Sequence, residues 1–323
     1  MAIPHSSLVI CSAALLCVIV IIITNVISLN LTFSDAVIAV VASVVDVIAV
    51  LFSMGPSRVP GKTVYANINE LPAAHFVQFK EDNFQVQRYW DIVSREHQHS
   101  LQETVNNVRT LVTDAVERQL VSDVPVCTFL SGGIDSSIIS KIASDKMELH
   151  TYSLDYEENT AHFKASSFQS TEDGPFVQMM VENINSQHHA VTIAQHDLVK
   201  SLKDALQAKD YPSMADIDGA LLLFCGEIKK DFKVALSGEC ADELFGGYPW
   251  FQQDSSRFPW ITSIDERSDL FKPEWREKLK LQETFAQCYE EALSNLNHLE
   301  TEREKLFALN QHYFIQTAME KES

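Results

Sequence analysis

Two short stretches of the chain combine glycines with hydroxyl and carboxylate side chains. The first, residues 130–137 (LSGGIDSS), follows the apolar run 124–129 and precedes the amphipathic run 138–143. This order predicts a buried strand, a tight glycine turn and then a helix whose first turn contains Asp135 and Ser136. Adjacent glycines let the backbone approach a ligand closely, and the free N–H groups at the start of a helix favour an anion. The first stretch therefore predicts a polyphosphate-binding site.

The first stretch is not a Walker loop, G-x-x-x-x-G-K-[ST], because it has neither the glycine spacing nor the lysine of that motif. The stretch resembles instead the pyrophosphate-binding loop, S-G-G-x-D-S, of enzymes that split ATP into AMP and pyrophosphate. A plain Ser/Gly hairpin turn is the alternative, and the flanking strand and helix disfavour it.

The second stretch, residues 237–248 (SGECADELFGGY), follows the short apolar run 233–236. Again a strand is predicted to lead into Ser-Gly and a helix, at the carboxyl edge where open α/β sheets bind ligands. Glu239 and Asp242 are three positions apart, so we expect them on one face of a helical turn. Two such carboxylates are suited to holding Mg²⁺ between the protein and phosphate oxygens. The alternative role is that one of them accepts a proton from an attacking amine. An ordinary acidic helix start is the alternative.

The elements around both stretches alternate between strand and helix. Helices are predicted around 101–120, 175–184, 197–208 and 217–230, and strands at 124–129, 149–154, 189–193 and 233–236. This alternation is typical of βαβ units with a parallel sheet covered on both faces. Short antiparallel strands are predicted earlier, at 63–65, 75–79 and 84–90, and they are too little sheet to be stable alone. After Arg257 the chain is predicted to be helical.

The composition argues against several classes of partner and site. The formal charge of −19 and the pI near 4.9 argue against a nucleic-acid surface, which needs a basic face. The six cysteines show no C-x-x-C pairing and no metal-ligand spacing. We therefore expect buried free thiols in a reducing compartment, which implies a cytoplasmic location for the catalytic part.

The first fifty residues are strongly hydrophobic. Residues 8–29 carry no charge and meet the length rule for a membrane span, and a second apolar run, 36–52, is interrupted by Asp46. No Lys or Arg precedes Arg58, so the charged start of a signal peptide is missing. Two interpretations stay open. One is a membrane hairpin that anchors the chain, with membrane contact through residues 8–52, and the other is a segment that is not native.

Together the motifs make the chain similar to asparagine synthetase of the glutamine-hydrolysing type, from about residue 54 to the end. In addition to the two stretches, several smaller segments support the resemblance. His188 and His189 match a strand entry of that family, and the other matching segments are 214–218, 55–61, 68–75 and 87–91. The segments before residue 92 look like the closing strands of that family's glutaminase domain and the join that follows it.

The resemblance implies three parts and a fold. The parts are a hydrophobic segment (1–53), the end of a glutaminase-like β domain (54–92) and an asparagine synthetase domain that is incomplete at its C-terminus (93–323). The implied fold is α/β: a parallel, doubly wound sheet of the adenine nucleotide alpha hydrolase-like type, that of the PP-loop ATP pyrophosphatases. A β stub precedes it and helices follow it.

The resemblance also implies a ligase that uses ATP and Mg²⁺. The side-chain carboxylate of aspartate attacks the α-phosphorus to give β-aspartyl-AMP, and ammonia then displaces AMP. Carried over to this chain, Glu239 and Asp242 are catalytic, and Asp135 and Asp242 hold the metal. His188 and His189 are expected to serve packing. The ATP and pyrophosphate contacts are Leu130, Ser131, Gly132, Gly133, Asp135, Ser136, Ser153, Leu154, Ser237 and Gly238.

The chain departs from that family at both ends. Position 2 is Ala2, where the family's glutaminase domain has its catalytic cysteine, so we expect no glutamine hydrolysis and ammonia as the nitrogen source. The chain ends at Ser323, before a D-R-x-S-M-like stretch and a lysine that the family uses, so activity is left open. The alternatives are another PP-loop ligase such as β-lactam synthetase, or a catalytically inactive nucleotide-binding or membrane-anchored remnant. A homodimer is also left open.

Overall fold

The structure is a computed structural model. It describes residues 45–54, 63, 68–80, 83–90, 97–165, 171–209, 215–248, 251, 263–294, 299 and 301–310. The chain divides into two compact units, one formed by residues 93–249 and the other by the described parts of residues 1–92 and 250–323. The predicted apolar span 8–29, the segment 55–61 and Met214 lie outside the described residues.

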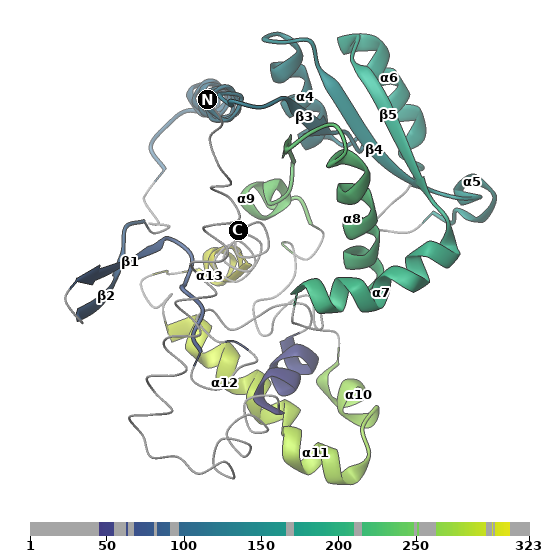
Figure 1. Cartoon of the computed structure of the whole chain (residues 1–323). Helices are drawn as coiled ribbons and strands as arrows, with labels where there is room; N and C mark the ends of the chain where they lie inside the picture. The colour runs from purple at the N-terminus through teal and green to yellow at the C-terminus, as the bar shows by residue number, and fades with distance from the viewer. Residues whose placement is uncertain are drawn as a thin grey trace. The chain divides into compact units, whose positions relative to one another are not determined.

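The unit of residues 93–249 is built on a four-stranded sheet (Figure 1). All pairings are parallel, in the order β5-β4-β3-β6. The chain passes outward from β3 through β4 to β5 and then returns to the other side of β3. The strand order therefore reverses between β3 and β6, which makes the carboxyl edge there a switch point. The predicted parallel sheet is confirmed, with strands β3 (Val126–Phe129), β4 (His150–Tyr156), β5 (Gln187–Ile193) and β6 (Val234–Leu236).

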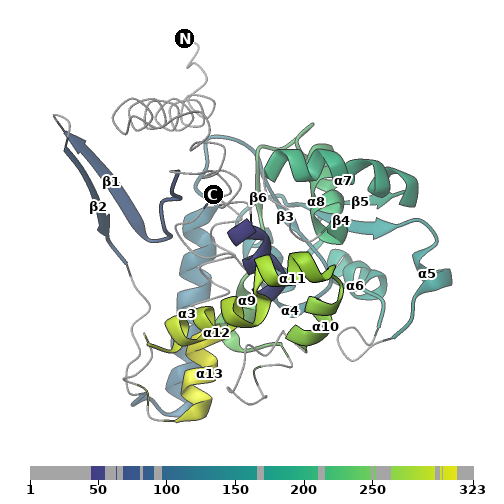
Figure 2. The same ribbon diagram turned by 90° about the horizontal axis from the view of Figure 1, so that it is seen from below.

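Helices cover both faces of this sheet (Figure 2). α4 (Ile134–Ser144) and α6 (Gly174–Ile184) lie on one side, and α7 (Gln195–Lys209) and α8 (Ala215–Ile228) lie on the other. α3 (Leu101–Gln119) begins with a capping box, in which the Ser100 hydroxyl accepts from the Glu103 N–H and the Glu103 carboxylate accepts from the Ser100 N–H. A short helix, α5 (Asn159–His162), follows β4.

Alternating residues of each strand enter different cores, because neighbouring side chains point to opposite faces of a sheet. Val126 of β3 and Leu236 of β6 pack with residues of α3 and α4. Cys127 of β3 and Tyr152 of β4 pack on the opposite face, against Phe224 and other residues of α8. Burial on both faces confirms the doubly wound arrangement that the sequence predicts.

The other unit contains a hairpin and a group of helices. β1 (His75–Lys80) and β2 (Asn83–Arg88) pair antiparallel, as predicted, with Phe79 opposite Phe84. The hairpin leaves Phe79 71% exposed. The predicted C-terminal helices are α10 (Ile264–Asp269), α11 (Pro273–Leu279), α12 (Leu281–Ser294) and α13 (Glu302–Asn310).

Residues 45–54, the end of the second apolar run, form a helix that packs in this unit (Figure 1). Ala49 and Met54 are buried in two neighbouring apolar clusters formed with residues of the C-terminal helices. The buried Ser53 hydroxyl donates to the Leu281 carbonyl at 2.9 Å. The Phe52 ring meets Phe271 edge to face at 4.7 Å. This helix is therefore part of the fold. In the part of the chain that the structure describes, no helix combines the length and apolarity needed to cross a membrane.

The burial of Ala49 predicts a large effect of a charge at that position. Ala49→Asp places an unpaired carboxylate among apolar side chains, so we expect it to lower the free energy of unfolding by roughly 3 kcal/mol or more. The measurement is urea unfolding followed by circular dichroism. Asp46→Asn, at an exposed position on the same helix, is the control and is expected to change little. Equal stability of Ala49→Asp and the unsubstituted chain would show that residues 45–54 do not pack as described.

Candidate nucleotide and metal site

The first loop joins β3 to the start of α4. Leu130 is fully buried, and its N–H donates to the Tyr152 carbonyl at 2.8 Å, so the strand pairing continues to the loop. α4 then begins at Ile134, after an N-cap residue, Gly133, that has no side-chain acceptor. The first N–H groups of a helix have no acceptor within the helix. The start of α4 therefore presents N–H donors to a ligand at the carboxyl edge of the sheet.

Two serine hydroxyls hold the loop in shape. The Ser131 and Ser136 hydroxyl oxygens are 3.1 Å apart, and the Ser131 N–H donates to the Ser136 hydroxyl at 3.2 Å. The Ser136 hydroxyl donates to the Gly133 carbonyl at 3.2 Å. Ser136 is 6% exposed, whereas Ser131 is exposed. Ser136 therefore serves mainly the loop itself, and Ser131 is the more accessible of the two hydroxyls.

The two adjacent glycines differ in backbone conformation and in the space that a Cβ would have. Gly132 has φ +81°, and a Cβ there would lie 2.8 Å from the Phe176 Cβ and 3.0 Å from the Asp173 carbonyl oxygen, at the start of α6. Gly133 has φ −70°, and a Cβ there would meet only the Ser131 hydroxyl, at 3.4 Å. The chain's own packing thus requires Gly132, while Gly133 leaves the surface of the loop open.

The second loop follows β6. The Ser237 hydroxyl accepts from the Glu239 N–H at 3.1 Å, and Cys240 then adopts a left-handed conformation with φ +71° before α9 (Ala241–Phe245). The expectation that Glu239 and Asp242 share one helical turn is wrong, because Glu239 lies before the helix and the left-handed residue separates them. Asp242 does lie in the first turn of α9. The sequence could not reveal this, since a cysteine rarely adopts positive φ.

The end of α9 encloses the Asp242 side chain. Gly246 ends the helix at φ +70°. The Gly247 N–H donates to the Asp242 carbonyl at 2.9 Å. A Cβ on Gly247 would lie 1.8 Å from Oδ1 of Asp242, a distance that no side chain tolerates. Glu243, which the sequence analysis did not single out, is 4% exposed beside them.

The two loops are in contact. Gly238 packs so closely against the first loop that a Cβ there would lie 3.0 Å from the Ser136 nitrogen and 3.1 Å from the Asp135 Cβ. The residues in contact are about a hundred positions apart in the sequence. Loops from the carboxyl ends of neighbouring parallel strands meet at one edge, and here that edge is the switch point between β3 and β6.

The charges of the two loops influence each other. Burial raises the pKa of the Asp135 carboxyl above its usual value, and the charge of Asp242 raises it further. Burial also raises the pKa of the Tyr248 phenol, with contributions from Glu243, Asp242 and Glu239. The site therefore gathers carboxylates from both loops, with Asp135 and Asp242 close enough to interact. Carboxylate oxygens are the ligands that Mg²⁺ prefers in proteins.

The predicted nucleotide contacts on β4 point in opposite directions. Leu154 packs in the apolar cluster against α8, whereas Ser153 lies on the face of α4 and α6. The Ser153 hydroxyl is 3.1 Å from Nε2 of His188, and Nδ1 of His188 is 3.0 Å from the Thr151 hydroxyl. The sequence alone does not reveal these contacts of His188, because they depend on the pairing of β4 with β5.

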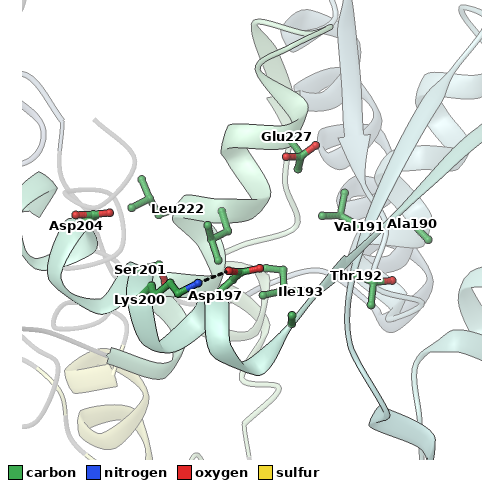
Figure 3. Close-up of a pocket in the computed structure, with 12 residues that line it drawn as sticks. Ala190, Val191, Thr192, Ile193, Asp197, Lys200, Ser201, Asp204, Leu222 and Glu227 are labelled. Atoms are coloured by element: carbon green, nitrogen blue, oxygen red, sulfur yellow. Dashed lines mark ion pairs between the residues drawn. The ribbon is translucent and has the colours of Figure 1, made fainter.

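A cavity elsewhere in this unit contains none of the predicted site residues. It has a volume of about 460 Å³ and lies between β5, α7 and α8, as Figure 3 shows. Val191, Leu222 and Glu227 are among its lining residues, and Asp197 forms an ion pair with Lys200 at 3.5 Å. We assign it no function.

The different environments of the two glycines predict different effects of alanine. Gly132→Ala creates a clash and strains a positive φ, so we expect a loss of roughly 2 kcal/mol or more in the free energy of unfolding. Gly133→Ala is expected to change stability by less than about 1 kcal/mol, because its backbone and surroundings accept a Cβ. Urea unfolding of both variants measures this. Equal losses in the two variants would contradict the described loop.

The interaction between Asp135 and Asp242 predicts a shift that can be measured. In Asp242→Asn the pKa of Asp135 falls towards 3.8 but stays above it, because burial remains. A carboxyl with a raised pKa binds more protons in the folded chain than in the unfolded chain. The free energy of unfolding therefore falls as pH rises from 3.8 through the raised pKa. Because Asp242→Asn lowers the pKa of Asp135, this loss of stability is smaller in the variant. Carboxyl ¹³C NMR titration without Mg²⁺ measures the pKa. Asp123→Asn, at an exposed position, is the control, and an unchanged Asp135 pKa in Asp242→Asn would refute the interaction.

Comparison with known proteins identifies the family. The family model described as asparagine synthase matches residues 107–322. The chain is 48% identical over 285 residues to asparagine synthetase (glutamine-hydrolyzing) 3 of Bacillus subtilis strain 168, covering 84% of this chain and 46% of that protein. It is 28% identical over 209 residues to the putative asparagine synthetase (glutamine-hydrolyzing) 2 of Methanocaldococcus jannaschii, covering 63% of this chain and 38% of that protein.

Similarity to solved structures is weak. The NH3-dependent NAD synthetase of Campylobacter jejuni aligns with 69% of this chain and 97% of its own at 14% identity and a TM-score of 0.32, and no conclusion rests on it. The chain spans less than half the length of the two curated relatives. From the family model and the first of those relatives, the chain belongs to the asparagine synthase family.

Proposed function

We propose that this chain carries out the ATP-dependent, AMP-forming amidation of aspartate to asparagine, through β-aspartyl-AMP and with ammonia as the nitrogen donor. The observation that carries the proposal is the contact of Gly238 with the Asp135–Ser136 peptide. This contact brings the start of α4, with its free N–H groups, close to the loop that carries Glu239 and Asp242. Such a site can hold a nucleotide and act on a second substrate beside it. The family assignment favours this activity over those of β-lactam synthetase and the other PP-loop ligases.

The first loop would hold the pyrophosphate part of ATP. The N–H groups at the start of α4 and the exposed Ser131 hydroxyl are its donors, and Gly133 lets the phosphates approach the backbone. Leu130 directly follows β3, and Ser153 and Leu154 lie on β4 just beyond Tyr152, which pairs with the last residue of β3. We place the adenosine here. Ser237 and Gly238 would line the other side of the nucleotide.

Mg²⁺ fits the carboxylates of this site. Asp135 and Asp242 come from different loops, and the charge of one raises the pKa of the other. A divalent cation between them would offset this repulsion, and both offer the oxygen ligands that it prefers. When bound, Mg²⁺ would neutralise charge on the pyrophosphate leaving group.

The chemistry needs two displacements. An oxygen of the aspartate side-chain carboxylate forms a bond to the α-phosphorus, and the bond from that phosphorus to the bridging oxygen breaks, releasing pyrophosphate. Ammonia then attacks the acyl carbon, and AMP leaves with the bonding electrons. The nitrogen must lose a proton during this second step. Glu239 is an exposed carboxylate next to Gly238, which suits a proton acceptor at the mouth of the site.

The described cysteines support a reducing, cytoplasmic setting for this reaction. Cys127 and Cys288 are buried free thiols, as expected, whereas Cys240 is partly exposed and Cys225 is exposed. Burial raises the pKa of the Cys127 thiol to about 12, which keeps it protonated and unreactive.

Substitution of Glu239 tests the proposed chemistry. Glu239→Gln keeps the size and removes the charge, so folding and ATP binding are expected to change little. Aspartate-dependent pyrophosphate release is expected to fall on the order of a hundredfold if the carboxylate acts in the transition state. The assay contains ATP, Mg²⁺, aspartate and ammonium, with asparagine measured in parallel.

The control for this substitution is Glu277→Gln, at an exposed position of α11. It is expected to leave the rate unchanged. Unchanged pyrophosphate release in Glu239→Gln would show that this residue is only an acidic residue before a helix. An unsubstituted chain that binds ATP but releases no pyrophosphate would contradict catalysis and favour an inactive nucleotide-binding protein.

A further inference from the structure

His188 connects the buried face of the sheet to a residue of the proposed nucleotide site. It lies on β5 opposite Thr151 of β4. Its Nδ1 is 3.0 Å from the Thr151 hydroxyl, and its Nε2 is 3.1 Å from the Ser153 hydroxyl. Thr151 is completely buried and also contacts the Ser186 hydroxyl at 3.0 Å. Both ring nitrogens are thus engaged, and the imidazole has one defined orientation.

The charge state of His188 limits what these contacts can be. Burial lowers the pKa of His188, and the neighbouring His189 lowers it further, so the ring is neutral at neutral pH. A neutral imidazole has one N–H, so one nitrogen donates and the other accepts. The hydroxyls of Ser153, Thr151 and Ser186 then form a chain in which each group can donate to the next, an arrangement in which hydrogen bonds reinforce each other.

We propose that His188 is a positioning residue for base recognition: it accepts the hydrogen of the Ser153 hydroxyl and so turns the lone pairs of that oxygen towards the 6-amino group of adenine. The inference rests on the proposed function, in which Ser153 contacts the adenosine. With its hydrogen directed at Nε2 of His188, the oxygen can only accept from the base. It therefore favours adenine, which has an amino group at C6, over a purine with a carbonyl oxygen there.

The adjacent histidine provides a natural contrast. His189 lies on the opposite face of β5, where it stacks on Tyr152 at 4.6 Å and bonds to the His150 ring at 2.9 Å. Its surroundings are the aromatic side chains near Phe232 of the other core. Neither of the hydroxyls that contact His188 lies on that face. A general effect of losing a histidine from β5 would therefore appear at both positions, whereas a role in base recognition appears only at His188.

Two amide substitutions separate the two contacts of His188. The amide of asparagine lies near the position of Nδ1, so His188→Asn keeps the contact with Thr151 and loses that with Ser153. The amide of glutamine reaches the position of Nε2, so His188→Gln keeps the contact with Ser153. The measurement is the affinity of the full chain for ATP and for ITP, which has a carbonyl oxygen at C6, by isothermal titration calorimetry, with thermal unfolding of each variant.

We expect His188→Asn to weaken ATP binding about tenfold, and to reduce the preference for ATP over ITP to that of Ser153→Ala. His188→Gln is expected to bind ATP within about threefold of the unsubstituted chain. His189→Asn is expected to leave the preference unchanged. In the double variant His188→Asn with Ser153→Ala, ATP binding should be no weaker than in Ser153→Ala alone, because His188 acts through Ser153.

Several results would overturn the inference. They are an unchanged ATP preference in His188→Asn, an equal loss in His188→Gln, or an additive loss in the double variant. If His188→Asn does not fold, Ser153→Ala provides the test. An unchanged preference for ATP over ITP in Ser153→Ala also refutes the proposed role of His188, because His188 is proposed to act through the Ser153 hydroxyl. Failure of the unsubstituted chain to bind ATP would overturn the proposed function too, whereas ATP binding that is insensitive to His188→Asn would overturn this inference alone.

Discussion

The site depends on one close contact, between Gly238 and the peptide that joins Asp135 to Ser136. A Cβ at Gly238 would lie 3.0 Å from the Ser136 nitrogen, so even alanine would push the two loops apart. The contact is possible because β6 returns to pair with β3 after the chain has passed through β4 and β5. If β6 did not neighbour β3, the glycine loop after β3 would lie apart from the loop that carries Glu239 and Asp242.

The same contact brings negative charges together. Asp135 and Asp242 approach closely enough for one to raise the pKa of the other, and Glu243 is buried nearby. Like charges at short range are unfavourable, and sites that retain them are commonly sites where a cation or a proton takes part. The N–H groups at the start of α4 add the opposite preference, for an anion. The two preferences together suit a nucleotide polyphosphate with its counter-ion.

Much of this could be predicted from the sequence, because the signals are local. Apolar runs alternate with helical periodicity, and a capping box marks the start of α3. Features that depend on distant pairing could not be predicted. The contacts of His188 with Thr151 and Ser153 follow only from the register of β4 and β5. The left-handed conformation of Cys240, which separates Glu239 from Asp242, could not be predicted either, because cysteine rarely adopts positive φ. The packing of residues 45–54 was also missed, because an apolar run alone does not show what it contacts.

The most direct test of the account follows an oxygen atom. If the aspartate side-chain carboxylate attacks the α-phosphorus, one of its oxygens stays with AMP when ammonia displaces the nucleotide. The unsubstituted chain is incubated with ATP, Mg²⁺, ammonium and aspartate labelled with ¹⁸O in the side-chain carboxylate, and AMP is analysed by mass spectrometry. The account predicts AMP that carries one ¹⁸O for each asparagine formed. Asparagine formed with unlabelled AMP, or with ADP and phosphate in its place, would contradict it.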